Sequence, residues 1–64
     1  MTKKDYELIA RAMKAELGDY DNMSEGYRAI LKIVEILITI FKENNERFNA
    51  IKFLTACGLS KDEI

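Results

Sequence analysis

The segment Tyr27–Phe41, YRAILKIVEILITIF, is far more apolar than one face of a helix requires in a chain of 64 residues. At about 100° per residue, the polar side chains in and beside this segment fall into one narrow stripe. That stripe contains Arg28, Lys32, Glu35, Thr39 and Lys42. The other positions form an apolar arc of roughly 220°, about twice the arc that a surface helix normally buries. The segment therefore predicts either the central rod of a small bundle or a helix that reserves part of its arc for a second chain.

The rest of the chain predicts an all-α fold, because it contains no proline and only three glycines. The fold class that we expect is a three-helix bundle with a long apolar central helix, in a single helical domain over residues 1–64. The predicted helices span about 3–17, 25–43 and 49–57.

Local signals predict where the first helix begins and ends. Thr2, followed by Asp5, has the spacing of a side-chain cap with an acidic first turn, and Gly18 is a plausible C-terminal stop. Capping-box spacing recurs at Ser60 and Glu63, which indicates a short final turn.

The second and third helices have equally clear end signals. Ser24 is the expected N-cap of the long helix, and Asn49 is the expected N-cap of the last one. Phe48 and Phe53 flank Asn49 at the spacing of a hydrophobic staple. Gly58 is placed to end the third helix in the left-handed conformation, within a Schellman motif.

The small size of the chain makes its core marginal, because a domain of this length buries only about 60% of the surface that its unfolded form exposes. Small domains often compensate with disulfides, a metal or oligomerisation. A single cysteine cannot form an internal disulfide, and without histidine the usual ligands of a structural zinc site are missing. Oligomerisation is the remaining route, so we expect a homo-oligomer, in the simplest case a dimer.

Charge and hydropathy indicate a cytoplasmic protein. Ten basic and eleven acidic residues give a net charge of −1, and no block of like charge stands out. The N-terminal residues lead into a charged amphipathic segment without the features of a secretory signal. The longest uncharged run, residues 36–41, is too short for a membrane span. A free Cys57 agrees with a reducing compartment.

Two patches of sequence carry a resemblance to known proteins. The first patch is Asp5–Tyr6 with Ile9–Ala10, and the second is NERFN at 45–49 followed by FL at 53–54 and ACG at 56–58. The chain resembles small uncharacterised helical proteins of phage and bacterial genomes, in which the second patch reads Asn-Pro-Arg-Phe-Asp before Phe-Leu-x-Ala-Cys-Gly.

This chain departs from that pattern at two positions, with Glu46 in place of proline and Asn49 in place of aspartate. Glutamate suits the start of a helix and asparagine caps as well as aspartate, so both changes preserve the expected turn. The resemblance implies a phage or mobile-element setting and a role in binding a host component. It carries over no functional residue.

The residues indicate no catalytic, cofactor or metal site. Cys57 is the one strong nucleophile, but no histidine is present to activate it, and its place in an apolar stripe predicts a core residue. The acidic segment that begins at Asp19 superficially resembles a calcium loop. Its register fails, because Ser24 occupies the position that requires glycine and Ile30 occupies the twelfth position. We therefore expect a protein that is not an enzyme.

The apolar arc of the long helix is the strongest functional signal. It predicts a non-catalytic interaction protein that associates with itself and binds a host protein. The predicted contact residues are Tyr27, Ile30, Ile33, Ile36, Leu37, Ile40 and Phe41, and the predicted polar rim is Arg28, Lys32 and Glu35.

Three alternatives remain open. The first and third helices could cover the whole arc within one chain. The protein could instead be a small nucleic-acid-binding regulator, although the third helix offers only Lys52 with Arg47 ahead of it, and the overall acidity opposes phosphate binding. It could also be a structural accessory in an assembly such as a virion or scaffold.

Overall fold

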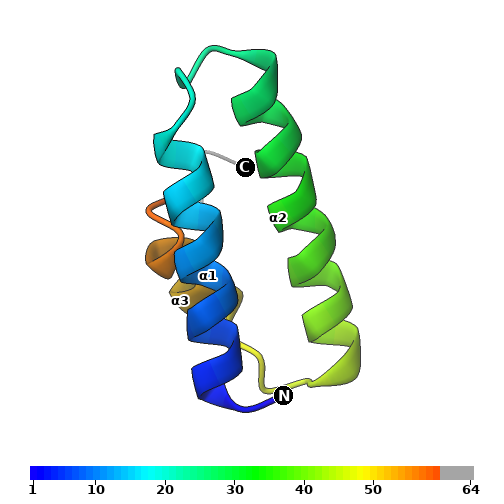
Figure 1. Cartoon of the computed structure of the whole chain (residues 1–64). Coiled ribbons are helices and arrows are strands. Elements are labelled where there is room, and N and C mark those ends of the chain that lie inside the picture. Colours follow the sequence, from blue (N-terminus) through cyan, green and yellow to red (C-terminus); the bar gives the residue numbers. More distant parts are fainter. Residues whose placement is uncertain (60–64) are drawn as a thin grey trace.

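The structure, a computed structural model, describes residues 1–59 and contains three helices (Figure 1). They are α1 (Lys3–Gly18), α2 (Glu25–Asn44) and α3 (Ala50–Ala56). Helices α1 and α2 run in opposite directions, and the short α3 lies beside α1 (Figure 1). The all-α, three-helix prediction is thus confirmed, and each helix end lies within one residue of its predicted position. The final turn predicted at Ser60 and Glu63 lies outside the described residues.

The side-chain cap predicted for α1 is present, and it forms a full capping box. The Asp5 backbone nitrogen donates to the Thr2 hydroxyl at 3.3 Å, and the Thr2 backbone nitrogen donates to Oδ2 of Asp5 at 2.9 Å. The backbone bond from Thr2, with a smaller contribution from its side chain, lowers the pKa of the Asp5 carboxyl. Helix α1 ends at Gly18, but its C-cap, Asp19, keeps a right-handed backbone with φ −84°. Helix α1 therefore ends without a residue in the left-handed conformation that glycine favours.

Helices α2 and α3 begin at the predicted caps. The Ser24 hydroxyl accepts a hydrogen bond from the Tyr27 backbone nitrogen at 3.2 Å. The Asn49 side chain accepts one from the Lys52 backbone nitrogen at 3.0 Å. Both bonds satisfy donors that the first turn of a helix leaves without an intrahelical partner.

The end of α3 is the predicted Schellman motif. Gly58 has φ +80°, the left-handed value that favours glycine. The Leu59 nitrogen donates to the Leu54 carbonyl at 2.9 Å, and the Gly58 nitrogen donates to the Thr55 carbonyl at 3.0 Å. The chain therefore turns back here, and Leu59 is buried in the core.

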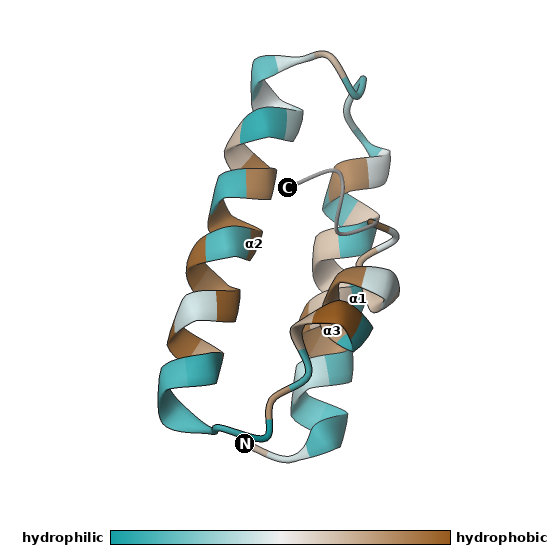
Figure 2. Ribbon diagram, turned by 180° about the vertical axis from the view of Figure 1, so that it is seen from behind, coloured by the Kyte–Doolittle hydropathy of each residue, from teal (hydrophilic) through white to brown (hydrophobic). Residues whose placement is uncertain are grey.

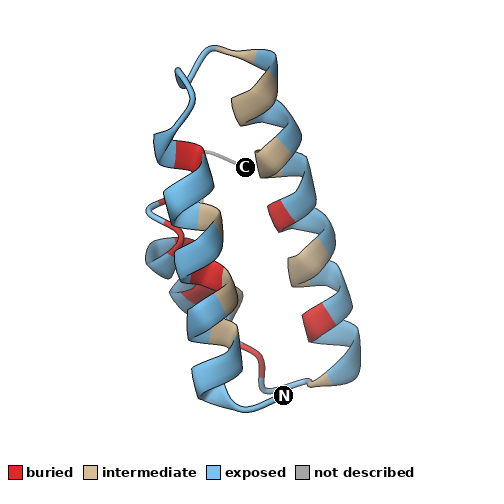
Figure 3. Cartoon of the chain, in the orientation of Figure 1, coloured by how far each residue is buried: buried red, intermediate tan, exposed pale blue. Residues whose placement is uncertain are grey.

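The core runs along the facing sides of α1 and α2 and is completed by α3 and the 45–49 turn (Figure 3). Its buried members are Ala10, Leu17, Val34, Phe41, Phe48, Phe53, Leu54, Cys57 and Leu59. An aromatic cluster joins the elements near the 45–49 turn, because the ring of Tyr6 lies 4.9 Å from both Phe41 and Phe48. The rings of Phe48 and Phe53 are 5.6 Å apart, which confirms the predicted staple.

Within residues 1–59, helix α2 is covered from one side only. Helices α1 and α3 both lie on the same side of it in two opposite views (Figures 1 and 2). In α2 only Val34 and Phe41 are buried. The central position expected for this helix is therefore not observed, because the short α3 packs mainly against α1. In residues 1–59 no helix is long and apolar enough to cross a membrane.

Candidate interaction surface

The structure divides the apolar arc of α2 into two parts. One part faces the core and is centred on Val34, which is completely buried. Tyr27, Ile30 and Leu37 are half-buried and pack against this core. Phe41 is buried in the aromatic cluster, so that it belongs to the interior of a single chain. Four of the seven predicted contact residues thus already have neighbours within the chain.

The other part of the arc is exposed. Ile33, Ile36 and Ile40 have exposed fractions of 47%, 52% and 44%, respectively. At about 100° per residue these three side chains lie within an arc of about 60°. We call them the isoleucine row. In Figure 2 hydrophobic positions in the middle of α2 are accordingly not confined to the side that faces α1.

The predicted polar rim is also exposed. Arg28, Lys32 and Glu35 all lie on the solvent side of α2, next to the isoleucine row. The Thr39 hydroxyl donates to the Glu35 carbonyl at 3.1 Å, so its polar group is satisfied within the helix. The structure therefore places an apolar row and a charged margin side by side on one element.

Lys42 has a structural role that the sequence did not reveal. Its Nζ donates to the Glu46 carbonyl at 2.8 Å and to the Phe48 carbonyl at 3.3 Å. These bonds tie the end of α2 to the turn that precedes α3. Sequence periodicity assigned Lys42 to a solvated stripe, because the path of the 45–49 turn is not encoded in the helix period.

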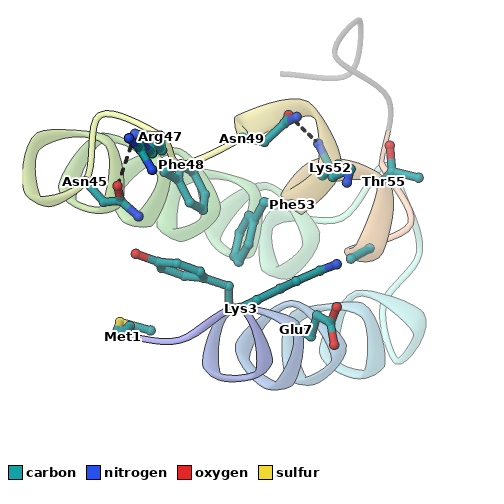
Figure 4. A pocket seen from close by; sticks show the side chains of 12 residues that line it. Met1, Lys3, Glu7, Asn45, Arg47, Phe48, Asn49, Lys52, Phe53 and Thr55 are labelled. Carbon is teal, nitrogen blue, oxygen red and sulfur yellow. Dashed lines mark hydrogen bonds between the residues drawn. The ribbon is translucent and has the colours of Figure 1, made fainter.

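A groove of about 700 Å³ lies between the start of α1 and the 45–56 region (Figure 4). Buried Phe48 and Phe53 form its apolar base, and Figure 4 shows Lys3 and Glu7 approaching from α1. Its lining residues are Met1, Lys3, Tyr6, Glu7, Asn45, Arg47, Phe48, Asn49, Lys52, Phe53, Thr55 and Ala56. One partial signal for this groove is visible in the sequence, the neighbouring Arg47 and Lys52. The contribution from α1 depends on helix packing and could not be read from the sequence.

A second, smaller groove of about 430 Å³ adjoins the isoleucine row. Ile40 lines it, together with Phe41 and the ring of Tyr6 from α1. The exposed row is therefore continuous with a hollow at the end of the molecule where the aromatic cluster lies.

Cys57 is a core residue, as predicted. Its side chain is 1% exposed, and burial raises the pKa of the thiol from 9.0 to about 11. The thiolate is the nucleophilic form of cysteine, so this thiol is unreactive near neutral pH. Within residues 1–59, no group of three or more His, Cys, Asp or Glu side chains is placed to hold a metal ion.

Comparison of the chain with models of protein families, with curated proteins and with solved structures gives no match. The resemblance to small phage and bacterial proteins accordingly stays a prediction. The geometry of α2 is the basis for the function inferred below.

Proposed function

We propose that this chain is a non-catalytic interaction protein that associates with itself through the isoleucine row of α2. The observation that supports this proposal is the exposure of Ile33, Ile36 and Ile40 in one line on a helix that is covered from one side. Fully burying an isoleucine side chain contributes about 1.5–3 kcal/mol, so each half-exposed member of the row offers about 1 kcal/mol on association.

A second copy of the chain is the simplest partner for this row. Two-fold symmetric pairs use the same patch on both subunits, and a small chain with a small core gains stability from association. A host protein would compete for the same row, since an apolar helix face also fits a hydrophobic groove. The phage or mobile-element origin and the cytoplasmic location in this proposal rest on the sequence.

The non-catalytic part of the proposal is supported by the state of Cys57. This thiol is the strongest potential nucleophile in the chain, and it is buried with a raised pKa. The isoleucine row itself consists of hydrocarbon side chains, which bind but do not carry out acid-base or nucleophilic chemistry.

Sedimentation velocity over a range of concentrations tests self-association. Ile36→Asp places a charge in the middle of the row and should convert the dimer to a monomer. Ile51→Asp is the matched control, because Ile51 is 61% exposed but lies on α3. The control should sediment like the parent. If Ile36→Asp also associates like the parent, the isoleucine row is not the interface.

Nucleic-acid binding is a second candidate function, favoured by one observation. Lys3, Arg47 and Lys52 all line the larger groove, where Glu7 is the one carboxylate among the lining residues. Retention on immobilised heparin at low salt, with a steep loss as salt rises, would support this function. If the parent is retained no better than an Arg47→Gln/Lys52→Gln variant, the groove does not bind polyanions.

A further inference from the structure

Exposed charged side chains follow one side of the isoleucine row along α2. Measured around α2 from Ile33, Lys32 lies about 100° and Glu43 about 80° away in the same direction. Both side chains are exposed, as is Arg28, which lies further toward the start of the helix. The opposite side of the row is apolar and leads through Leu37 into the core. Two further exposed carboxylates lie farther from the row, because Glu25 shares the angle of Glu43 but lies eight residues before Ile33, and Glu35 lies about 160° away from Ile33. The charged residues nearest the row are thus basic toward its N-terminal end and acidic toward its C-terminal end.

The positions along the helix axis make this margin self-complementary. The midpoint of the row lies between Ile36 and Leu37. At a rise of 1.5 Å per residue, Lys32 lies about 7 Å before this midpoint and Glu43 about 10 Å after it. When two copies of α2 pack in opposite directions about a two-fold axis through the midpoint, their charged margins lie on the same side. Lys32 of one copy then lies within about 3 Å, along the axis, of Glu43 in the other.

We propose that two copies of the chain pack α2 against α2 in an antiparallel register centred between Ile36 and Leu37. In this register Ile33 of one copy faces Ile40 of the other, and two symmetric Lys32–Glu43 pairs flank the apolar contact. Arg28, about 13 Å before the midpoint, adds a second cation near the same glutamate. This inference rests on the proposed self-association and deepens it by assigning the direction and register of the pair.

The charges select the direction of packing. A parallel pair related by a two-fold axis along the helices would place the two charged margins on opposite sides of the contact, so that no Lys32–Glu43 pair could form between the copies. Antiparallel packing also opposes the two helix dipoles, which is the favourable orientation for neighbouring helices. The row extends only about 10 Å along the helix, so the area that it can bury is well below that of a standard interface. We therefore expect a weak association, with a dissociation constant in roughly the micromolar range.

Charge reversal tests the register. Lys32→Glu and Glu43→Lys each turn both attractive pairs into repulsive ones, and each should weaken self-association by about tenfold. The double variant Lys32→Glu/Glu43→Lys restores opposite charges and should associate like the parent. An equimolar mixture of the two single variants should form a mixed dimer, since both of its charge pairs are attractive.

Lys4→Glu is the matched control, because it changes the net charge as Lys32→Glu does but lies on an exposed position of α1. Sedimentation equilibrium at low salt measures all five proteins, and circular dichroism checks that each is folded. The differences should shrink in about 0.5 M salt, where exposed charges are screened.

Three results would overturn the inference in distinguishable ways. A parent that remains monomeric at about 1 mM would overturn the proposed self-association itself. A parent that dimerises while every charge variant dimerises equally would leave self-association intact but exclude this register. Weakened single variants without recovery in the double variant would show that Lys32 and Glu43 do not face each other.

Discussion

Gly58 and Gly18 stand at the ends of two helices, yet they contribute to stability in opposite ways. Gly58 has φ +80°, and an alanine there would be strained by about 1–2 kcal/mol. Gly18 keeps a negative φ, and a Cβ added there would meet nothing within 4 Å. Gly58→Ala should therefore lower the urea midpoint. Gly18→Ala should raise the midpoint, because it should increase the free energy of unfolding by about 0.4–1 kcal/mol. Equal shifts in the same direction would contradict this assignment of the two helix ends.

The burial of Cys57 predicts a dependence of stability on alkaline pH. Its pKa is about 11 in the folded chain against an ordinary value of 9.0, so between these values the unfolded chain loses a proton that the folded chain keeps. Stability is therefore fully present below about pH 9 and falls as the pH rises toward 11. Urea unfolding of the parent and of Cys57→Ala across this range measures the effect as a difference. Parallel stability curves for the two proteins would show that the thiol titrates normally.

Most of the helix ends were predictable from single residues. Thr2, Ser24 and Asn49 cap their helices through hydrogen bonds that reach three residues along the chain. Gly58 likewise acts on its own backbone conformation. Such interactions depend on local sequence alone, which is why they can be read before the fold is known.

At the scale of the helices, Lys42 links α2 to the turn before α3. Replacing it with methionine keeps the aliphatic stem but removes both hydrogen bonds to the Glu46 and Phe48 carbonyls. We expect a loss of about 1 kcal/mol, the typical net contribution of such bonds. Lys4→Met on the exposed side of α1 is the control and should be nearly neutral. Thermal unfolding followed by circular dichroism compares them, and an unchanged Lys42→Met would show that solvent replaces both bonds.

The division of the apolar arc in α2 was not predictable from the sequence. Helical periodicity places Phe41 and Ile40 side by side in one apolar face, with no sign of which will be buried. The structure decides, because Tyr6 of α1 brings its ring to Phe41, while no aromatic ring among residues 1–59 covers Ile40 in the same way. The outcome depends on where α1 and α3 pack, and α3 is too short to cover the middle of α2. The larger groove escaped prediction for the same reason.

For the whole molecule, folding and association are expected to be coupled. A partner that binds only the folded chain stabilises it by mass action, so an associating protein melts at a higher temperature when it is more concentrated. The free energy of unfolding of a domain is only about 0.05–0.15 kcal/mol per residue. Because the core of this chain is small, we expect association to supply a large share of that free energy.

We therefore expect the midpoint of thermal unfolding to rise between about 5 µM and 500 µM parent protein, a range that spans the expected affinity. The thermal midpoint of Ile36→Asp should not depend on protein concentration. It should also lie close to the midpoint of the parent at its lowest concentration, because Ile36 does not belong to the buried core. Ile51→Asp should retain the dependence of the parent, since it leaves the row intact. A parent whose midpoint does not move over this range would show that the chain folds without any contribution from association. The exposed isoleucines would then have to be explained by a different partner protein.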